Sequence, residues 1–563
     1  MRRKVLSLLL CMSLTLSGLL ACSGGKEETT NVDTSSAGAD QTQEAADETA
    51  ANESDEPAVG EVTEGLSSIF PLEEPITLTY YIVQNSAMSA TMESYADVEF
   101  FKELEELTNV HIEWNHNVGN ENFALMMTGG ELPDMINWPL GNAAGGVAAL
   151  LEDEIILNLT DLLPEHAPNY YNWMKNNPEE DKAFKLDDGS YYQFVNFNAD
   201  WENNDIIYFG IFGPQIRQDW LDRVGMDMPA TTDELYEVLC AFRDQDANGN
   251  GDPGDEVPFV IDGDLVALWG VPGSFGTRRD VHLQDGEIVY GPITDNYKTF
   301  LTYMNKLFSE GLINTDFAVN RDALGLLVQD RAGFTYASMG TVIQNHEALK
   351  AENPEANYVS VPWLVGPDGY QCFTRDKNAN PRATAITTSC ENPEIALAWL
   401  DYAYSYKGSI DSTFGVEGKS YEYVDGYPTI MDEVKENDNG WSVEQSMARW
   451  MLGPITYPNA RDHRYYEQMN LVEDYMVDLQ TNWALANDDI TLPPIVMTVD
   501  EGSTYSAIMA DIGTFVDEYS LKFITGDLSI EDEWDNYVRA IEGMNVSEAL
   551  DCKKSAYERY QSR

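Results

Sequence analysis

The chain has 563 residues, of which 43% are hydrophobic and 11% aromatic, and its 96 acidic side chains against 33 basic ones give a formal net charge of −63 at pH 7. A chain of this length exceeds the size at which one hydrophobic core stops growing, so we expect two lobes. The charge argues against nucleic acid as a partner and disfavours polyanionic ligands, because the field of the protein repels both.

The first residues have the pattern of a bacterial export signal. Met1–Lys4 is basic, and the apolar run from Val5 to Leu20 is too short to cross a bilayer comfortably. The run ends in Leu-Leu-Ala before Cys22, which resembles the lipobox at which the leader is cut and the cysteine is lipid-modified. We therefore expect a signal peptide over 1–21 and a membrane anchor on Cys22.

The next segment is acidic and poor in large apolar residues. It cannot bury enough surface to offset the entropy of ordering its backbone. The sequence thus predicts a flexible linker over 22–70, which would hold a folded part over 71–563 away from the envelope.

Strands alternate with helices at the start of the folded part. Ile76–Val83, Val110–Trp114 and Leu132–Trp138 carry strand patterns, and apolar residues at helical spacing separate them. This order predicts an α/β fold with a mostly parallel sheet and helices on its faces. Ligands of such sheets gather beyond the carboxyl ends of the strands, so Trp138 is a candidate ligand contact. Packing at the edge of the lobe is the alternative.

A strand over Ile206–Phe212 and a helix over Ile216–Gly225 are expected next. A capping box at Thr231 and Glu234 then opens a helix that leads into a loop over 244–258.

That loop alternates oxygen-bearing side chains with glycines, as in loops that wrap Ca²⁺. Two registers fit, one starting at Asp244 and the other at Asp246. The second would supply Asp246, Asn248, Asn250, Asp252 and a closing Asp255 or Glu256. A polar turn without metal is the alternative.

The loop leaves into Val257–Ile261, where Pro258 and the β-branched residues predict a strand. A helix–loop–helix calcium sensor is thereby disfavoured, and we expect a fixed structural ion. Farther on, helices are predicted over 297–307 and 393–406, and the last helix is expected to bury Ile530, Trp534 and Ile541.

Aromatic and polar residues supply the candidate ligand contacts. Sugars present apolar faces edged with hydroxyls, so their sites combine flat rings with a few hydrogen-bonding groups. The candidates are Trp138, Trp201, Arg217, Trp269, Trp363, Glu417, Trp450 and Arg461. Core packing is the alternative for each aromatic residue, and an ion pair within its lobe is the alternative for Arg217.

Motifs for catalysis are absent from the sequence. It contains no Gly-x-Ser-x-Gly and no His-Glu-x-x-His, and its six histidines are dispersed. We expect no enzyme. The alternatives are a cell-surface glycan-processing enzyme or adhesin, and a binding protein for a non-sugar solute.

In their order along the chain, the motifs resemble those of the LplA-type extracellular solute-binding lipoproteins of sugar ABC importers. The resemblance is carried by Leu132–Asp134, Leu159–Leu162, Ala167–Asn169, Arg217–Leu221, Pro229–Leu235, Asp246–Gly251, Gly415–Tyr421, Lys522–Gly526 and Trp534–Tyr537. It covers nearly all of the folded part, and the order is more specific than any single motif.

The resemblance implies a two-lobed periplasmic-binding-protein-like (type II) clamp with hinge strands between the lobes. The first lobe would comprise about 71–200 and a later segment. The second would comprise about 201–335 and would include the loop over 244–258, which we call the cation loop. The C-terminal helices would pack across both lobes. It implies a monomer without catalytic role that delivers a carbohydrate, in particular an oligosaccharide, to the permease subunits of an ABC importer.

In that family the loop binds calcium, and aligning Ala241-Phe242 with the family pattern puts its first ligand at Asp246. This chain has one extra residue before the end of the loop. The closing ligand is therefore either Asp255 or Glu256.

Overall fold

The computed structural model describes residues 65–563 apart from 117–118, 144, 208–209, 211, 263–269, 321, 373–382, 437–438, 440, 452–456, 471–472, 485–486 and 488. The expected signal peptide, Cys22, most of the linker over 22–70, and Trp269 lie outside the described residues.

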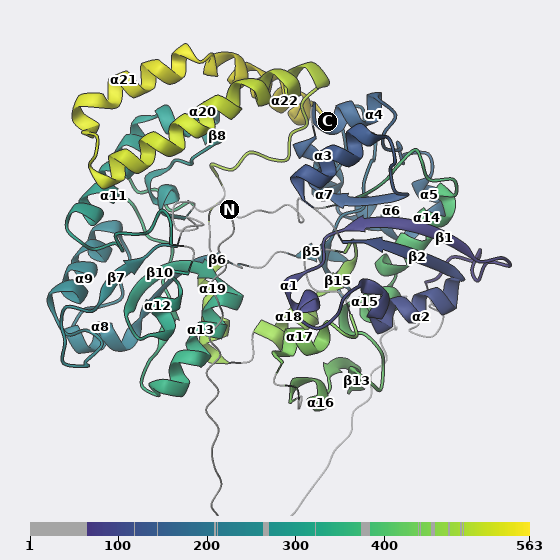
Figure 1. The fold of residues 1–563 in the computed structure, drawn as a ribbon, viewed down its shortest axis with the longest axis horizontal. Helices are drawn as coiled ribbons and strands as arrows, with labels where there is room; N and C mark the ends of the chain where they lie inside the picture. Colours follow the sequence, from purple (N-terminus) through teal and green to yellow (C-terminus); the bar gives the residue numbers. More distant parts are fainter. Residues whose placement is uncertain are drawn as a thin grey trace, which may run out of the picture. The chain divides into compact units, whose positions relative to one another are not determined.

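The first sheet has the strand order β12-β3-β1-β2, and its neighbouring strands β1 and β2 are labelled in Figure 1. Its strands are β1 (Ile76–Ile82), β2 (Val110–Asn115), β3 (Met135–Trp138) and β12 (Ala383–Ile386). β1 pairs in parallel with both β2 and β3, whereas β12 is antiparallel to β3. The prediction of a mostly parallel sheet is confirmed, and a strand from much later in the chain completes its edge.

Helices cover both faces of this sheet. One face packs against α2 (Glu99–Thr108), α6 (Pro168–Asn176) and α14 (Pro393–Asp401), and the other against α3 (Asn120–Gly129) and α4 (Gly146–Glu152). Successive strand residues point to opposite faces, so Tyr80 enters the first core and Tyr81 the second. The short helices α5 (Leu163–His166) and α7 (Pro178–Ala183) flank α6 in the chain.

The second sheet has the order β11-β6-β10-β7. Its strands are β6 (Phe212–Arg217), β7 (Val257–Val260), β10 (Ala332–Ser338) and β11 (Tyr358–Ser360). One face packs against α8 (Gln218–Val224), α9 (Thr232–Asp244) and α11 (Asp295–Ser309), and the other against α12 (Gly325–Val328) and α13 (Met339–Glu352). We call the parts built on the two sheets the first and second lobes.

The helix expected from Ile216 is wrong at its start, because α8 begins at Gln218. Ile216 and Arg217 instead end β6, which is paired with β10 on one side and β11 on the other. Pairing between distant segments overrides the helical pattern here. The capping box at Thr231 and Glu234 and the strand at Val257 are both confirmed.

Smaller elements complete the two lobes. Three short strands, β4 (Phe197–Asp200), β5 (Asp205–Ile207) and β15 (Ala460–Asp462), form a third sheet. Two hairpins are β8 (Val281–Gln284) with β9 (Glu287–Tyr290) and β13 (Tyr421–Val424) with β14 (Tyr427–Ile430). Further helices are α1 (Ser86–Ser89), α15 (Tyr406–Phe414), α16 (Asp432–Lys435), α17 (Val443–Met447), α18 (His463–Asn470) and α19 (Asp474–Trp483).

The helix predicted over 393–406 is interrupted. α14 ends at Asp401, a 3-10 turn over Tyr402–Tyr404 follows, and α15 begins at Tyr406. The hydroxyl of Ser405 accepts the backbone N–H of Gly408, so a new helix cap separates the two helices.

Three long helices end the chain, α20 (Val499–Thr525), α21 (Ile530–Gly543) and α22 (Val546–Ser562). The predicted face of α21 is buried as expected. It is not the last helix, however, because α22 follows; this helix buries only Val546, Ala549 and Ala556 and so lacks a strong apolar stripe. None of the helices in the described part of the chain is long and apolar enough to span a bilayer.

Candidate functional site

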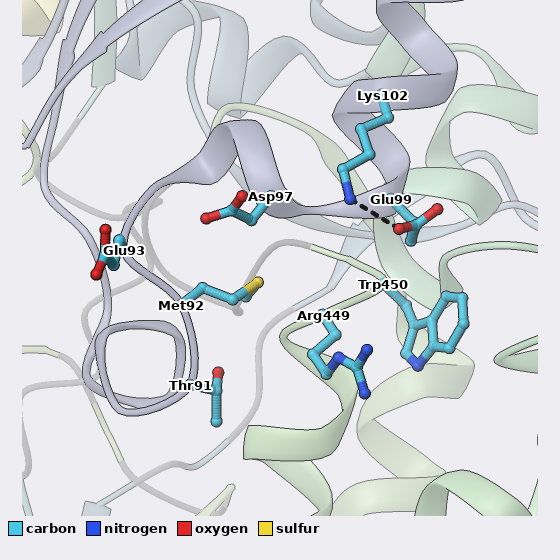
Figure 2. Close-up of a pocket in the computed structure, with 8 residues that line it drawn as sticks. All are labelled: Thr91, Met92, Glu93, Asp97, Glu99, Lys102, Arg449 and Trp450. Carbon is cyan, nitrogen blue, oxygen red and sulfur yellow. Dashed lines mark hydrogen bonds and ion pairs between the residues drawn. The ribbon is translucent and has the colours of Figure 1, made fainter.

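A pocket lies at the carboxyl end of β1 (Figure 2). Its volume is about 410 Å³, and it is lined by Thr91, Met92, Glu93, Asp97, Glu99, Lys102, Arg449 and Trp450. Six of these residues come from the segment after β1 and the start of α2, and two follow α17. This edge of a parallel sheet is where ligands of α/β proteins gather, and the volume lies in the range of small-molecule sites.

Backbone hydrogen bonds join the two distant segments of the pocket. The N–H of Glu99 donates to the carbonyl of Arg449 at 3.0 Å, and the N–H of Phe100 donates to the carbonyl of Trp450 at 3.2 Å. The first N–H groups of a helix have no partner within it, so these carbonyls satisfy the start of α2. Residues 449 and 450 are thereby fixed at the pocket.

His116 holds the segment after β1 in place. Its Nδ1 donates to the carbonyl of Ile82 at 2.9 Å, and its Nε2 accepts the N–H of Tyr95 at 3.2 Å. A ring that donates from one nitrogen and accepts at the other is neutral. Burial lowers the pKa of His116, which also favours the neutral form.

Charges of both signs line the pocket. Lys102 Nζ pairs with Glu99 Oε1 at 2.9 Å, whereas Glu93 and Asp97 are exposed. In Figure 2 the carboxylates of Glu93 and Asp97 lie toward one side of the pocket, and Arg449 lies toward the other, next to Trp450. The pocket therefore offers both hydrogen-bond acceptors and donors.

Trp450 is the candidate residue that lines this pocket, and its indole is half-buried. The backbone of Gly415, at φ 88°, lies against it, and a Cβ at this position would come within 2.6 Å of the Trp450 Cβ. A glycine is therefore required beside Trp450.

Trp138 and Trp201 pack within the first lobe. Trp138 ends β3, is buried, and stacks on Phe123 with ring centroids 5.8 Å apart. Its Nε1 is buried without a hydrogen-bond partner. Trp201 is half-buried, and its Nε1 donates to Ser409 Oγ at 2.9 Å.

Arg461 and Glu417 lie in the part of the chain that follows α14. Arg461, on β15, donates from Nε to Asn198 Oδ1 at 2.9 Å, and burial lowers its pKa to about 10. Glu417 is exposed in the turn between α15 and β13. Neither residue lines the pocket.

Arg217 and Trp363 belong to the second lobe. Arg217 is fully buried and pairs with Asp219 at 2.7 Å and with Asp330. The ion pair within the lobe, considered above as the alternative for Arg217, is thus present. Trp363 is also buried, and its Nε1 donates to the carbonyl of Trp483 at 3.1 Å.

The cation loop is wound by hydrogen bonds from its own backbone. Asp246 Oδ2 accepts the N–H of Gly251 at 2.9 Å, Asn248 Oδ1 accepts that of Asn250 at 3.0 Å, and Asn250 Oδ1 accepts that of Asp252 at 2.7 Å. The oxygens of these side chains therefore turn toward the inside of the loop.

Two oxygens in the loop are buried without a partner, Asp246 Oδ1 and Glu256 Oε2. The other carboxylate oxygen of Glu256 accepts the N–H of Ala247 at 2.8 Å, so this side chain reaches back to the start of the loop. Burial raises the pKa of Glu256, and the charge of Asp255 adds to the effect. Buried carboxylate oxygens without partners are costly, and a bound cation would compensate them.

Asp255 is engaged differently. Its carboxylate accepts the amide N–H groups of Asn248 at 2.9 Å and Asn250 at 3.0 Å. Within the described ranges, no group of three or more His, Cys, Asp or Glu side chains is arranged to hold a metal. The oxygen set of this loop includes asparagine amides as well as carboxylates.

Thr91, Glu93, Asp97 and Arg449 were not among the ligand contacts expected from the sequence. One signal could have found the first three residues, because they follow a predicted strand of a parallel sheet at its carboxyl end. No local signal marks Arg449, which reaches the pocket only through contacts between distant segments.

Two α/β lobes, each an open sheet covered by helices on both faces, define the class of the protein as a two-lobed solute-binding protein of the periplasmic-binding-protein type. The chain belongs to the family of bacterial extracellular solute-binding proteins, whose model matches residues 89–410. The expected fold class and family are confirmed.

Three relatives illustrate the similarity. The fructooligosaccharide ABC transporter substrate-binding protein FusA of Streptococcus pneumoniae is 25% identical over 531 residues, which cover 88% of this chain and 92% of the relative. Lipoprotein LipO of Bacillus subtilis is 31% identical over 237 residues, or 39% and 45% of the two chains. The alginate-binding protein AlgQ2, solved without calcium ion, superposes with a TM-score of 0.71 at 22% identity, covering 87% of this chain and all of that one.

A solved FusA structure is also similar. It is described as an EF-hand mutant in complex with fructo-nystose, and it superposes with a TM-score of 0.65 at 21% identity. It covers 86% of this chain and 99% of its own.

Proposed function

We propose that this protein captures an oligosaccharide outside the cytoplasm and delivers it to the permease subunits of an ABC importer, without catalysing a reaction. The observation that carries the proposal is the pocket at the carboxyl end of β1, where Trp450 lies beside hydrogen-bonding charged groups. An aromatic face and polar groups that bond hydroxyls are what a sugar ring requires. FusA, a substrate-binding protein for fructooligosaccharides, supports the choice of ligand.

The role proposed for Trp450 is to stack on a sugar ring while Arg449 and Asp97 exchange hydrogen bonds with its hydroxyls. Trp138 is a second candidate contact, because its indole N–H is buried without a partner. Trp201, Glu417 and Arg461 also remain candidates on the first-lobe side. Closure of two lobes around the ligand would add contacts from the second lobe, where Trp269 and Trp363 are the candidates.

A calcium ion is proposed as a structural cofactor of the second lobe. The unpartnered oxygens of Asp246 and Glu256 support these two residues as its first and closing ligands, with Asn248, Asn250 and Asp252 between them. Asp255 would then orient the two asparagine amides. When bound, the ion would neutralise the buried carboxylates. The description of a FusA structure as an EF-hand mutant supports a cation loop in this family.

An N-terminal lipid on Cys22 is proposed to hold the protein at the outer face of the cell membrane, after removal of the leader over 1–21. The lipoprotein LipO among the relatives supports this. The acidic segment over 22–70 would then act as a tether for a monomeric receptor. Labelling cells with a radioactive fatty acid and comparing wild type with Cys22→Ser tests the anchor; equal labelling of both would contradict it.

The ligand is tested by thermal shift and calorimetry with a panel of oligosaccharides. We expect one sugar per chain and no change in the sugar, whereas release of shorter products would show an enzyme. Trp450→Leu should weaken binding at least about fivefold, since stacking contributes about 1 kcal/mol or more. Tyr423→Ala, which removes an exposed ring on β13 outside the pocket, is the matched control and should bind as wild type does.

A further inference from the structure

The charged side chains that line the pocket are unevenly paired, and this imbalance affects which kinds of sugar the pocket can bind. Three carboxylates and two cationic side chains line it. Glu99 and Lys102 neutralise each other at 2.9 Å. The remaining carboxylates are those of Glu93 and Asp97, and the remaining cationic group is the guanidinium of Arg449, on the other side of the pocket (Figure 2).

We propose that Glu93 and Asp97 make this pocket select uncharged oligosaccharides over uronic-acid oligosaccharides. The proposal rests on the proposed function and adds a specificity to it. Both kinds of ligand are named among similar proteins, because these include a fructooligosaccharide-binding and an alginate-binding protein.

The hydroxyls of a neutral sugar suit both sides of the pocket. A hydroxyl donates one hydrogen bond and accepts others, so it can donate to the carboxylate of Asp97 or Glu93 and accept from Arg449. Hydrogen bonds to charged partners are stronger than those between neutral groups. Neither partner requires a charge on the ligand.

For a uronate in this pocket, electrostatic repulsion would outweigh attraction. Its carboxylate could pair with Arg449, but Glu93 and Asp97 would repel it, and both are exposed at the pocket with no ion pair among the described residues. The net charge of −63 adds repulsion of the same sign during approach. Because the two carboxylates are solvated, the effect should be moderate and should weaken with salt.

Arg449 is a single cationic group, and one guanidinium faces the repulsion of two carboxylates at this pocket. Its guanidinium lies over the ring of Trp441 at 5.7 Å, and it is the only cation of the pocket not paired with a carboxylate in the described part of the chain. Arg217 and Arg464, two arginines outside the pocket, are paired with aspartates elsewhere. A cluster of basic groups that could outweigh Glu93 and Asp97 is thus missing from the eight lining residues.

The test compares neutral and acidic trisaccharides by calorimetry on the full mature chain. The neutral probes are kestose, maltotriose, xylotriose and mannotriose, and the acidic probes are trigalacturonate and trimannuronate. We expect the best neutral probe to bind at least about tenfold more tightly than either acidic probe at about 20 mM NaCl, with a smaller ratio at about 500 mM.

The double variant Glu93→Gln/Asp97→Asn should reduce that ratio about tenfold, mainly by improving the affinity for the acidic probes. The control Glu106→Gln/Glu113→Gln removes two exposed charges outside the pocket and should leave the ratio within about twofold of wild type. Circular dichroism would establish that both variants fold.

The outcomes are distinct. An acidic probe that binds as tightly as the best neutral one would overturn the selectivity but not the proposed function. A ratio unchanged in the double variant would remove Glu93 and Asp97 as its cause. If no sugar of either kind binds, the proposed function and this inference both fail.

Discussion

Arg559, in the last helix of the chain, forms an ion pair at 2.5 Å with Asp187, which lies 372 residues earlier in the first lobe. The same guanidinium pairs with Glu501 at the start of α20. α20 also packs against α4 of the first lobe and α11 of the second. The C-terminal helices therefore contact both lobes, and the ion pair of Arg559 with Asp187 links them to the first lobe.

Replacing Arg559 by glutamine should destabilise the protein by about 1 kcal/mol, because two carboxylates lose their common partner at a partly exposed site. Urea unfolding measures the change. Arg539→Gln on α21 is the control, because Arg539 is exposed and donates to Asn536 and to the carbonyl of Asp535. Its effect should stay within about 0.5 kcal/mol. Equal effects of the two variants would contradict the role of Arg559.

A second prediction concerns pH. The pKa of His116 is lowered in the folded protein, so between that pKa and its ordinary value of about 6.5 the unfolded chain binds the proton more readily. The stability contribution of neutral His116 is therefore complete above about pH 6.5 and is lost as the pH falls below it. Protonated Nε2 could no longer accept the N–H of Tyr95.

Urea unfolding at about pH 5, 6 and 7.5 should show a smaller loss of stability on acidification for His116→Gln than for wild type. His282 and His346 also have lowered pKa values. The contribution of His116 is therefore the difference between wild type and variant in how the free energy of unfolding changes with pH. A His116 variant with an unchanged pH dependence would show that the ring does not titrate against folding.

Chelation should separate the two registers of the proposed calcium loop. Chelation is expected to lower the melting temperature of wild type, since a ligand at about 100 times its Kd stabilises the folded state by about 2.7 kcal/mol. Asp246→Asn and Glu256→Gln should each abolish most of the difference between calcium and chelator. Asp244→Asn should retain it, because Asp244 is exposed and pairs with Arg243 at 2.7 Å. Loss of the response in Asp244→Asn would favour the register that starts there.

Local signals account for what the sequence predicted well. The capping box at Thr231 satisfies N–H groups within four residues, and Pro258 restricts its own backbone. The start of α9 and the strand β7 could therefore be predicted without knowledge of the fold. The two-lobed architecture was predicted from the resemblance to the solute-binding family. Its motifs lie in the right order even where each is weak alone.

The parts that were missed depend on distant partners. β6 is a strand because β10 and β11 bond to both of its edges, although its last two residues fit the following helical pattern. The pocket joins Asp97 to Arg449 through bonds between segments far apart in the chain. α22 has few buried apolar residues and is held by ion pairs of Arg559 and Arg563 with Asp187. Periodicity alone shows none of these contacts.

The last prediction concerns Arg217, for which the sequence allowed either a ligand contact or an internal ion pair. Asp330 accepts from Arg217, and its carbonyl accepts the amide of Asn248 at 3.2 Å, so the buried arginine is linked to the cation loop. Arg217→Met leaves the carboxylates of Asp219 and Asp330 without their cation and should cost about 3 to 5 kcal/mol in urea unfolding. Arg243→Gln, which breaks an exposed pair, should cost less than about 1 kcal/mol. If Arg217→Met instead keeps wild-type stability and loses sugar binding, Arg217 is a ligand contact and the internal role is wrong.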